Sequence, residues 1–361
     1  MNPMDALLIV GATGVVGQQL TRLLRQRHPE LPLLIAARDL AKAEHLAAEL
    51  GHAQALTMDV QQPGPLRGLR PRAVLALVND PEDFLLDDAL RAGIAYLDIT
   101  RWTERLNSAL ERVAAAAPSS PVLLASGWMA GLVSTLAGLA GQELARVERI
   151  ELSVLYALKD RSGPDSVEYM ARLATPFEVF EQGRRISVKP YSDPRRVTFA
   201  SGRSARVHRF DTPDPFMLSE TTGARSLSAR IAFDDRLSMP LLIALGRSGL
   251  WRLIASARFK GLRQAILHNP GKGAAHELLI EIQGLDRHGQ PRTQRIGLHD
   301  PLGQTHLTAL GALLQVERLL GLDGAPPPPA GLLYPSTALS LDAVLQGLEA
   351  QGVAVSRKAV S

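Results

Sequence analysis

The stretch LLIVGATGVVGQQL, residues 7–20, constrains the fold of this chain most strongly. Four apolar residues lead straight into Gly11, Gly14 and Gly17, and a helical pattern follows the glycines. A strand that ends in such a turn and restarts as a helix is typical of a dinucleotide site, where glycines allow the tight turn, the close approach of a pyrophosphate and the packing of helix on strand. The N–H groups that begin the helix would bind the phosphates. The residues expected to contact them are Gly11, Thr13, Gly14, Val15, Val16 and Gly17.

The residues at the end of the second expected strand indicate whether the chain prefers NADP or NAD. Residues 32–37 (PLLIAA) form that strand, and Arg38 and Asp39 follow it. An acid alone at this position binds the ribose 2′-hydroxyl and favours NAD, whereas a guanidinium pairs with a 2′-phosphate through two hydrogen bonds. Arg38, with Asp39 beside it and Lys42 one helical turn further on, therefore predicts NADP rather than NAD. The alternative is that Arg38 is a solvated strand end and Asp39 is the N-cap of the next helix.

Short apolar runs alternate with helical patterns through the first third of the chain. The expected strands are 7–10, 33–37, 53–58, 73–78, 94–99 and 122–125, and the helices among them are 14–27, 40–50, 81–92 and 103–117. Such alternation predicts an α/β fold with a doubly wound parallel sheet, the Rossmann architecture, and places the ligand at the carboxyl ends of the strands. Three residues at these ends, Asp59, Val60 and Asn79, are further candidates for cofactor binding, with Asn79 expected to hold the nicotinamide ribose.

The pattern changes after a helix expected at 132–145. Residues 149–158 (RIELSVLYAL) alternate with a period of two, as in a strand with one solvated face, and similar patterns occur at 197–199, 205–210, 226–233, 277–283 and 293–298. Helices are expected at 166–173, 305–320 and 339–351. We therefore expect a Rossmann domain of residues 1–126, completed by C-terminal helices in 301–361, with residues 127–300 inserted as an α+β domain for substrate binding and dimerisation.

Composition excludes several function classes. The chain has no cysteine, so disulfides, thiolate nucleophiles and thiolate metal sites are excluded. Its nine histidines lack metal-ligand spacing, and we expect no metal site. The net charge of +4 is accompanied by no aromatic platform or known binding motif, so we expect no nucleic-acid partner. The absence of a visible signal peptide before the first strand favours a cytoplasmic protein.

The apolar segment 237–267 needs a separate interpretation. Four basic residues and several helix breakers interrupt it, so it does not read as a membrane span. We expect one or two amphipathic helices that pack in the core or in a dimer interface. Contact with a lipid surface or an acyl substrate, through Arg247, Arg252 and Arg258, is the alternative that we do not favour.

Candidate catalytic residues lie beside the expected cofactor. None of the five tyrosines has a lysine four residues later, so the pair used by short-chain dehydrogenases is missing, and no Gly-x-Ser-x-Gly elbow of a serine hydrolase occurs. Tyr96 and Asp98 alternate at the end of the fifth strand and are candidates for catalysis, although Asp98 could equally cap the following turn. Lys159 is the third catalytic candidate.

Two loops supply candidates for substrate binding. Trp128 and Met129 lie in the glycine-bounded turn 127–131, which follows the sixth strand and begins a helix. Arg161 lies in the loop 159–166, where it and Lys159 would suit a substrate carboxylate. The alternatives are a core or hinge role for Trp128 and a solvated loop at 159–166.

Taken together, the chain resembles the saccharopine dehydrogenase-like oxidoreductases. The resemblance rests on the segments 11–17 (GATGVVG), 93–100 (GIAYLDIT), 127–131 (GWMAG), 308–310 (TAL), 331–335 (GLLYP) and 345–353 (LQGLEAQGV). It implies a Rossmann domain with an inserted substrate domain and NAD(P)-linked redox chemistry. Relatives include saccharopine enzymes of the lysine pathway, polyamine enzymes, and enoyl reductases that act in trans on lipid chains. Many relatives carry Asp-Pro where this chain has Met129 and Ala130.

These features predict an NADP-dependent oxidoreductase. It would transfer a hydride to or from a C=N, C=O or C=C bond of a small metabolite in a cleft between its two domains. Two alternatives stay open, namely an NADP-binding sensor or scaffold without turnover and a lipid-associated enoyl reductase. We expect a small-molecule substrate and a homodimer.

Overall fold

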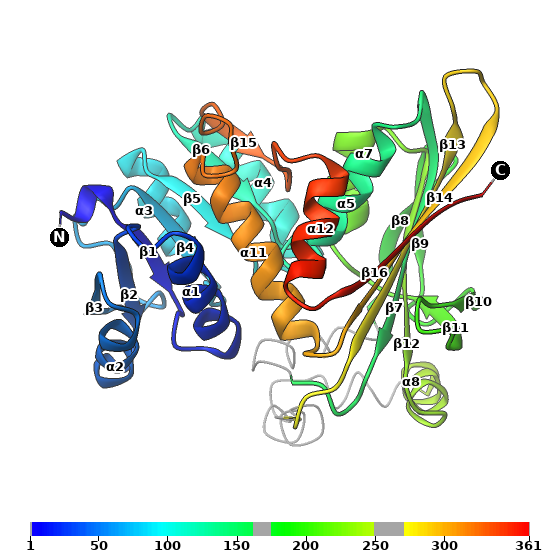
Figure 1. Cartoon of the computed structure of the whole chain (residues 1–361), viewed down its shortest axis with the longest axis horizontal. Helices are drawn as coiled ribbons and strands as arrows, with labels where there is room; N and C mark the ends of the chain where they lie inside the picture. The colour runs from blue at the N-terminus through cyan, green and yellow to red at the C-terminus, as the bar shows by residue number, and fades with distance from the viewer. Residues whose placement is uncertain (1, 162–174, 249–270, 361) are drawn as a thin grey trace. The chain divides into compact units, whose positions relative to one another are not determined.

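The chain forms two compact units. The computed structural model describes residues 2–161, 175–248 and 271–360 (Figure 1). The first unit comprises Met1–Leu132 and Thr308–Leu339, and the second comprises Val133–Leu307 and Ser340–Ser361. The helix expected at 166–173 lies outside the described residues.

A parallel sheet of seven strands forms the centre of the first unit. Its strands are β1 (Leu7–Val10), β2 (Leu33–Ala37), β3 (Ala53–Thr57), β4 (Ala73–Ala76), β5 (Ala95–Asp98), β6 (Pro121–Leu124) and β15 (Gly331–Leu333). They lie in the order β15-β6-β5-β4-β1-β2-β3, and every neighbouring pair is parallel. The order reverses direction at β1, since β2 lies on one side and β4 on the other. The predicted doubly wound Rossmann sheet is confirmed, with β15 as an added edge strand.

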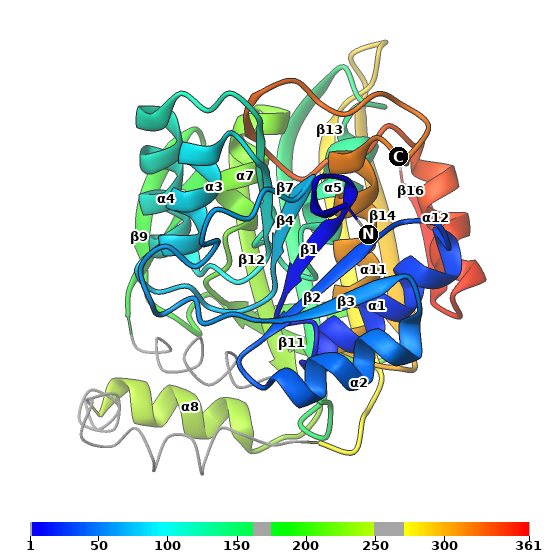
Figure 2. The ribbon, with the colours of Figure 1, turned by 90° about the vertical axis from the view of Figure 1, so that its left-hand side faces the viewer.

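Helices cover both faces of this sheet. They are α1 (Val15–Arg27), α2 (Leu40–Leu50), α3 (Phe84–Ala92), α4 (Thr103–Ala116) and α11 (Gln304–Leu320), after a short 3-10 turn at Pro3–Asp5. Figure 2 shows α3 and α4 on one face and α1, α2 and α11 on the other. On that second face, Leu313 and Val316 of α11 join Ile9 and Ile35 in one buried cluster. The late helix therefore completes a core that the first strands begin.

A mixed sheet of nine strands forms the second unit. Its main path is β10-β11-β12-β7-β13-β14-β16, and β8 pairs with β12 and β9. The strands are β7 (Arg146–Tyr156), β8 (Phe177–Glu181), β9 (Arg184–Val188), β10 (Arg195–Thr198), β11 (Ser204–Arg209), β12 (Ser226–Phe233), β13 (His276–Leu285), β14 (Pro291–Asp300) and β16 (Ala354–Val360). The described helices are α5 (Leu132–Gly141), α7 (Asp214–Thr222), α8 (Ser238–Arg247) and α12 (Leu341–Ala350). All six period-two segments of the sequence are strands here, so the predicted α+β class is confirmed.

The face of this sheet that carries Glu151 and Ser153 of β7 is less exposed to solvent than the alternating sequence pattern predicts. Glu151 and Ser153 of β7 are only 6% and 3% exposed. A small apolar cluster on the same face packs Phe199 and Val207, from the β10–β11 hairpin and its loop, against Leu155 of β7. The expectation of a wet face was therefore wrong for the middle of β7, because the hairpin covers it.

The C-terminal segment also differs from the expectation. Residues 340–361 belong to the second unit rather than to the nucleotide-binding one, because β16 pairs with β14 over seven residues. The sequence of β16, AVSRKAV, places three polar residues in a row and hides the period of a strand. Only the stretch Thr308–Leu339 of the expected C-terminal complement lies in the first unit.

Helix α8 occupies the start of the amphipathic segment 237–267, and residues 249–270 lie outside the described part of the chain. Leu237 and Leu241 are 78% and 59% exposed, so this helix presents apolar side chains to solvent. Among the described residues, no helix combines the length and the apolar content that crossing a bilayer requires.

Candidate dinucleotide site

The glycine turn after β1 is packed so closely that two of its glycines have no room for a side chain. Gly11 has φ +89°, and a Cβ atom there would lie 2.4 Å from Cγ1 of Val78. A Cβ atom on Gly17 would lie 2.5 Å from the carbonyl oxygen of Gly11 and 2.6 Å from Cα of Ala12. All three distances are below any ordinary carbon contact. Gly17 therefore lets α1 pack directly on the turn, and Gly11 lets Val78 pack against it.

The third glycine leaves the N-terminus of α1 open. Gly14 is the N-cap of α1, is exposed, and supplies no side-chain cap. A Cβ atom on Gly14 would meet only the Gly11 carbonyl oxygen, at 3.3 Å. The next residue, Val15, is 40% exposed. The first N–H groups of a helix have no partner within the helix, so α1 presents donors and a positive dipole end to an anion at this surface.

The end of β2 presents a cation to the solvent beside the glycine turn. Asp39 is the N-cap of α2, because its Oδ1 accepts a hydrogen bond from the backbone N of Lys42 at 3.2 Å. The Lys42 ammonium lies 3.5 Å from Oδ2 of Asp39, and both side chains are largely exposed. Within the part of the chain that the structure describes, the exposed Arg38 side chain makes no ion pair. The capping alternative is therefore correct for Asp39, and it leaves Arg38 available to a ligand.

The ends of β3 and β4 hold the remaining cofactor candidates. Asp59 accepts a hydrogen bond from the backbone N of Gln61 at 3.1 Å, and Val60 is 8% exposed. Asn79 follows Val78, the residue that packs against Gly11, and its Oδ1 accepts a hydrogen bond from Nη1 of Arg105. Because the sheet is parallel, these strand ends share one edge with the glycine turn.

A buried ionic network lies at the carboxyl ends of β4, β5 and β6. Arg101 is 3% exposed and binds Asp98 through Nε and Asp83 through Nη1, both at 2.5 Å. Ser126 donates its hydroxyl to Oδ1 of Asp98 at 2.7 Å and accepts the backbone N–H of Arg101 at 3.0 Å. Burial alone would lower the pKa of Arg101, but the charges of Asp98 and Asp83 outweigh it and raise that pKa well above its usual value. The sequence missed this network because its members come from three separate strand ends.

The structure buries the two catalytic candidates of β5. Tyr96 is 0% exposed and Asp98 is 1% exposed. Burial, followed by the charge of Asp98, raises the pKa of the Tyr96 phenol well above its usual value. Asp98 holds the side chain of Arg101 three residues later, which is close to its alternative role of fixing the turn. Both side chains are buried in this structure, so neither is accessible for direct contact with a substrate.

The turn after β6 has unusual backbone geometry. Met129, Ala130 and Gly131 have φ values of +55°, +53° and +75° in succession, and two of them are not glycine. A non-glycine residue in this left-handed region, such as Met129 or Ala130, stores about 1–3 kcal/mol of strain. Neighbours hold the turn in place, since a Cβ atom on Gly131 would lie 2.6 Å from the ring of Pro335, and Thr308 donates its hydroxyl to the sulfur of Met129 at 3.4 Å. Met129 is buried and Trp128 is half-buried, and their predicted substrate contacts stay predictions.

Lys159 and Arg161 lie in the second unit, where both are exposed. Between them Asp160 is 1% exposed, and its carboxylate accepts the backbone N–H groups of Arg161 at 2.7 Å and Gln304 at 2.8 Å. Burial raises the pKa of Asp160. Sequence analysis missed this aspartate, which fixes the loop that carries both candidates. The roles predicted for Lys159 and Arg161 remain predictions.

A second ionic cluster lies within the sheet of the second unit. Arg230 is 1% exposed and contacts Glu151 at 3.1 Å and Asp193 at 2.5 Å, and Arg209 contacts Asp193 at 3.0 Å. Burial by itself would raise the pKa of Asp193, but the hydrogen bonds and charges of the two arginines lower it to about 2. Asp193 therefore stays charged in the folded protein at all but very low pH.

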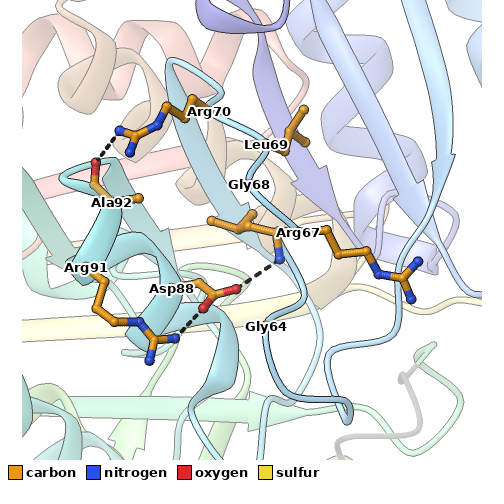
Figure 3. Close-up of a pocket in the computed structure, with 9 residues that line it drawn as sticks. Gly64, Arg67, Gly68, Leu69, Arg70, Asp88, Arg91 and Ala92 are labelled. Carbon is orange, nitrogen blue, oxygen red and sulfur yellow. Dashed lines mark hydrogen bonds and ion pairs between the residues drawn. The ribbon is translucent and has the colours of Figure 1, made fainter.

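A surface pocket of about 310 Å³ lies away from the candidate site (Figure 3). Its lining comes from the loop before β4 and the end of α3, at the amino edge of the parallel sheet. Its guanidinium groups do not converge, because Arg70 donates to the Ala92 carbonyl, Arg91 pairs with Asp88, and Arg67 points away from both (Figure 3). The pocket is therefore not a built anion site. Within the described ranges, no three His, Asp or Glu side chains group as metal ligands.

Comparison with known proteins supports the fold. No protein-family model matches the sequence, and no curated protein matches it significantly. Among solved structures, the chain is similar to apo saccharopine dehydrogenase (L-Glu forming) from Saccharomyces cerevisiae, with a TM-score of 0.67 and 14% identity over 99% of this chain and 100% of that one. The predicted resemblance is thus confirmed in the fold.

More distant matches have dehydrogenase and reductase names. Dihydrodipicolinate reductase from Paenisporosarcina sp. TG-14 matches with a TM-score of 0.41 and 11% identity, over 92% of this chain and 97% of that one. Scyllo-inositol dehydrogenase from Lactobacillus casei, solved with NAD(H), matches with a TM-score of 0.41 and 11% identity over 96% and 94%. At these TM-scores they add no argument.

Proposed function

We propose that the chain is an NADP-dependent oxidoreductase that transfers a hydride to or from a C=N, C=O or C=C bond of a small metabolite. The observation that carries the proposal is the open N-terminus of α1 above a turn in which Gly11 and Gly17 have no space for a side chain. Such a turn at the reversal point of a parallel sheet is suited to a pyrophosphate. When bound, the nicotinamide would supply the hydride chemistry.

Arg38 supports NADP over NAD within this proposal. It is exposed at the end of β2, one strand away from the glycine turn, and no described carboxylate neutralises it. Lys42 adds a second, exposed cation on the first turn of α2. Two cations near one ribose favour a 2′-phosphate through charge-assisted hydrogen bonds.

For the substrate we propose a chemical class and candidate contacts rather than one compound. The solved structure with the higher TM-score is a saccharopine dehydrogenase by name, which supports a small polar metabolite as substrate. Lys159 and Arg161 are exposed cations that would suit a carboxylate on it, with Trp128 and Met129 as further candidate contacts. A homodimer in the cytoplasm remains part of the proposal.

A sensor or scaffold without turnover is the second candidate function. One observation favours it: Tyr96 and Asp98, the acid–base candidates of the first unit, are both buried. Such a protein would bind NADPH with similar affinity but would not oxidise it in the presence of candidate metabolites. The lipid-associated alternative draws on the exposed Leu237 and Leu241, and vesicle binding would test it.

Calorimetry with NADPH, NADP⁺, NADH and NAD⁺ tests the proposal. We expect the phosphorylated forms to bind more tightly, and Arg38→Ala to weaken them about 10- to 100-fold while it leaves NADH almost unchanged. Arg67→Ala, at an exposed arginine on the amino edge of the same unit, is the matched control. Flat traces with all four nucleotides on folded protein would refute the site. Equal losses for NADPH and NADH would refute the 2′-phosphate assignment.

A further inference from the structure

We propose that Gln304 is a positioning residue, which holds Arg161 in the orientation that binds a carboxylate of the substrate. This inference rests on the proposed function, in which Arg161 is a candidate contact for that carboxylate. It adds to the second unit a residue from the start of α11. It also makes a carboxylate on the metabolite a determinant of binding.

The backbone of Arg161 is held at both of its hydrogen-bonding groups. Its N–H group donates to Oδ1 of Asp160 at 2.7 Å, and its carbonyl oxygen accepts from Nε2 of Gln304 at 2.8 Å. The other carboxylate oxygen of Asp160 accepts the backbone N–H of Gln304 at 2.8 Å. These three hydrogen bonds tie Arg161 to the first residue of α11 from both sides of its Cα atom.

Asp160, which joins the two segments, is itself fixed by its surroundings. It is 1% exposed, and a Cβ atom on Gly303 would collide with its Oδ1, so the chain before α11 closes over the carboxylate. The backbone N–H of Gly273 donates to the carbonyl oxygen of Lys159 at 3.1 Å. Segments from distant parts of the sequence therefore anchor the loop that carries Arg161.

The partners of Gln304 determine which way its side-chain amide faces. A backbone carbonyl only accepts hydrogen bonds, so the group that faces Arg161 must be the amide nitrogen of Gln304. The same nitrogen donates to Oη of Tyr156, the last residue of β7, at 3.1 Å. The Tyr156 ring packs edge-on against Phe233, with 5.8 Å between the ring centres. The amide is therefore held in a second direction by a tyrosine that is packed in place.

Arg161 presents a cation on this fixed backbone. Its side chain is exposed, and it makes no ion pair with any residue that the structure describes. A guanidinium binds a carboxylate through two parallel hydrogen bonds, which require a defined orientation. A backbone that is held before binding reduces the conformational entropy lost on binding. Gln304 therefore raises the affinity for a carboxylate that it does not touch.

Titration of glutarate, followed by ligand-detected NMR on the full-length protein, tests the inference. Glutarate is the carboxylate probe, and glutaramide, which should not bind, is its uncharged counterpart. Gln304→Met removes the donor and keeps the length of the side chain, so it should weaken glutarate about 10-fold. Arg161→Ala should weaken glutarate by at least that factor. The double variant should lose no more than Arg161→Ala alone, because Gln304 acts through Arg161.

Gln346→Met, at an exposed glutamine of α12 in the same unit, is the matched control and should bind glutarate as the unaltered protein does. Where Gln304→Met fails to fold, Gln304→Ala carries the comparison. Additive losses in the double variant, or a lower thermal stability of the Gln304 variant with unchanged glutarate affinity, would overturn the inference and leave a structural role. An unaltered protein that does not bind glutarate would overturn it as well.

Calorimetry with NADPH on the same samples separates this inference from the proposed function. We expect every variant to bind NADPH with unchanged affinity. NADPH binding without glutarate binding would overturn the inference while the nucleotide site stands. An unaltered protein that binds no NADPH would overturn the proposed function, and the inference with it.

Discussion

Gly17 and the carbonyl oxygen of Gly11 are so close that a Cβ atom at position 17 would lie 2.5 Å from that oxygen. The obstruction is backbone, which cannot rotate away as a side chain can. Helix α1 and the turn before it must therefore separate to accept any larger residue at position 17.

Gly17→Ala should lower the free energy of unfolding by about 1–3 kcal/mol, because overpacking forces the helix off the turn. Urea unfolding measures the loss. Gly347→Ala in α12 is the control, since a Cβ atom there meets nothing within 4 Å. That substitution should raise stability by about 0.5–1 kcal/mol. Unchanged stability in Gly17→Ala would show that the contact relaxes freely.

Gly14→Val should abolish nucleotide binding without unfolding the protein. Gly14 has φ −73° and ψ 172°, which valine adopts readily, and its Cβ atom would meet only the Gly11 oxygen at 3.3 Å. The valine side chain would occupy the place expected for the phosphates. A thermal melt checks folding and calorimetry with NADPH checks binding. Retained affinity in the folded variant would contradict the site.

Arg101→Met should destabilise the protein by about 3–5 kcal/mol, because it leaves the buried carboxylates of Asp98 and Asp83 without their cation. Both arginine contacts are 2.5 Å long, and the Arg101 side chain is 2% exposed. Arg112→Gln removes the ion pair with Asp87 at a 43% exposed side chain on α4, the helix that follows Arg101, and should cost less than about 1 kcal/mol. Chemical denaturation measures the free energy of unfolding of both variants. Similar decreases in the two would show that the burial of Arg101 does not determine its contribution to stability.

Acid should destabilise the second unit through Asp193. Its pKa falls from 3.8 to about 2 on folding, so the folded state prefers the charged form. The resulting stability is fully present above about pH 4 and is lost as the pH falls through 2. Asp193→Asn should flatten the dependence of unfolding free energy on pH in that window, whereas Asp342→Asn, at a 71% exposed side chain, should not. A slope that both variants share with the unaltered protein would exclude Asp193 as its source.

The central strands of the parallel sheet were predictable because they are buried on both faces. β1, β2 and β4 each form a short apolar run, and β1 and β2 have the expected bounds. The glycine turn was predictable because Gly14 and Gly17 both contact the backbone of Gly11 within the same short segment, so their spacing is visible in the sequence.

The features that the sequence did not predict depend on contacts between residues that are distant in the chain. Burial of Tyr96 and Asp98 depends on Arg101 and Ser126, which only the folded sheet brings together. Arg105 lies on α4, 26 residues from Asn79, and no spacing rule links the two. Charged strands such as β9 (RRISV) lack an apolar run, so pattern alone does not reveal them.

Helix α11 makes the first unit dependent on the end of the chain. Its Leu313, Val316 and Leu319 complete the buried cluster that Leu7 and Ile9 begin. A ribosome must therefore translate more than three hundred residues before the nucleotide-binding unit can finish its interior. Until then the nascent protein carries an unfinished apolar surface, and a fragment that stops at Leu132 would expose it permanently.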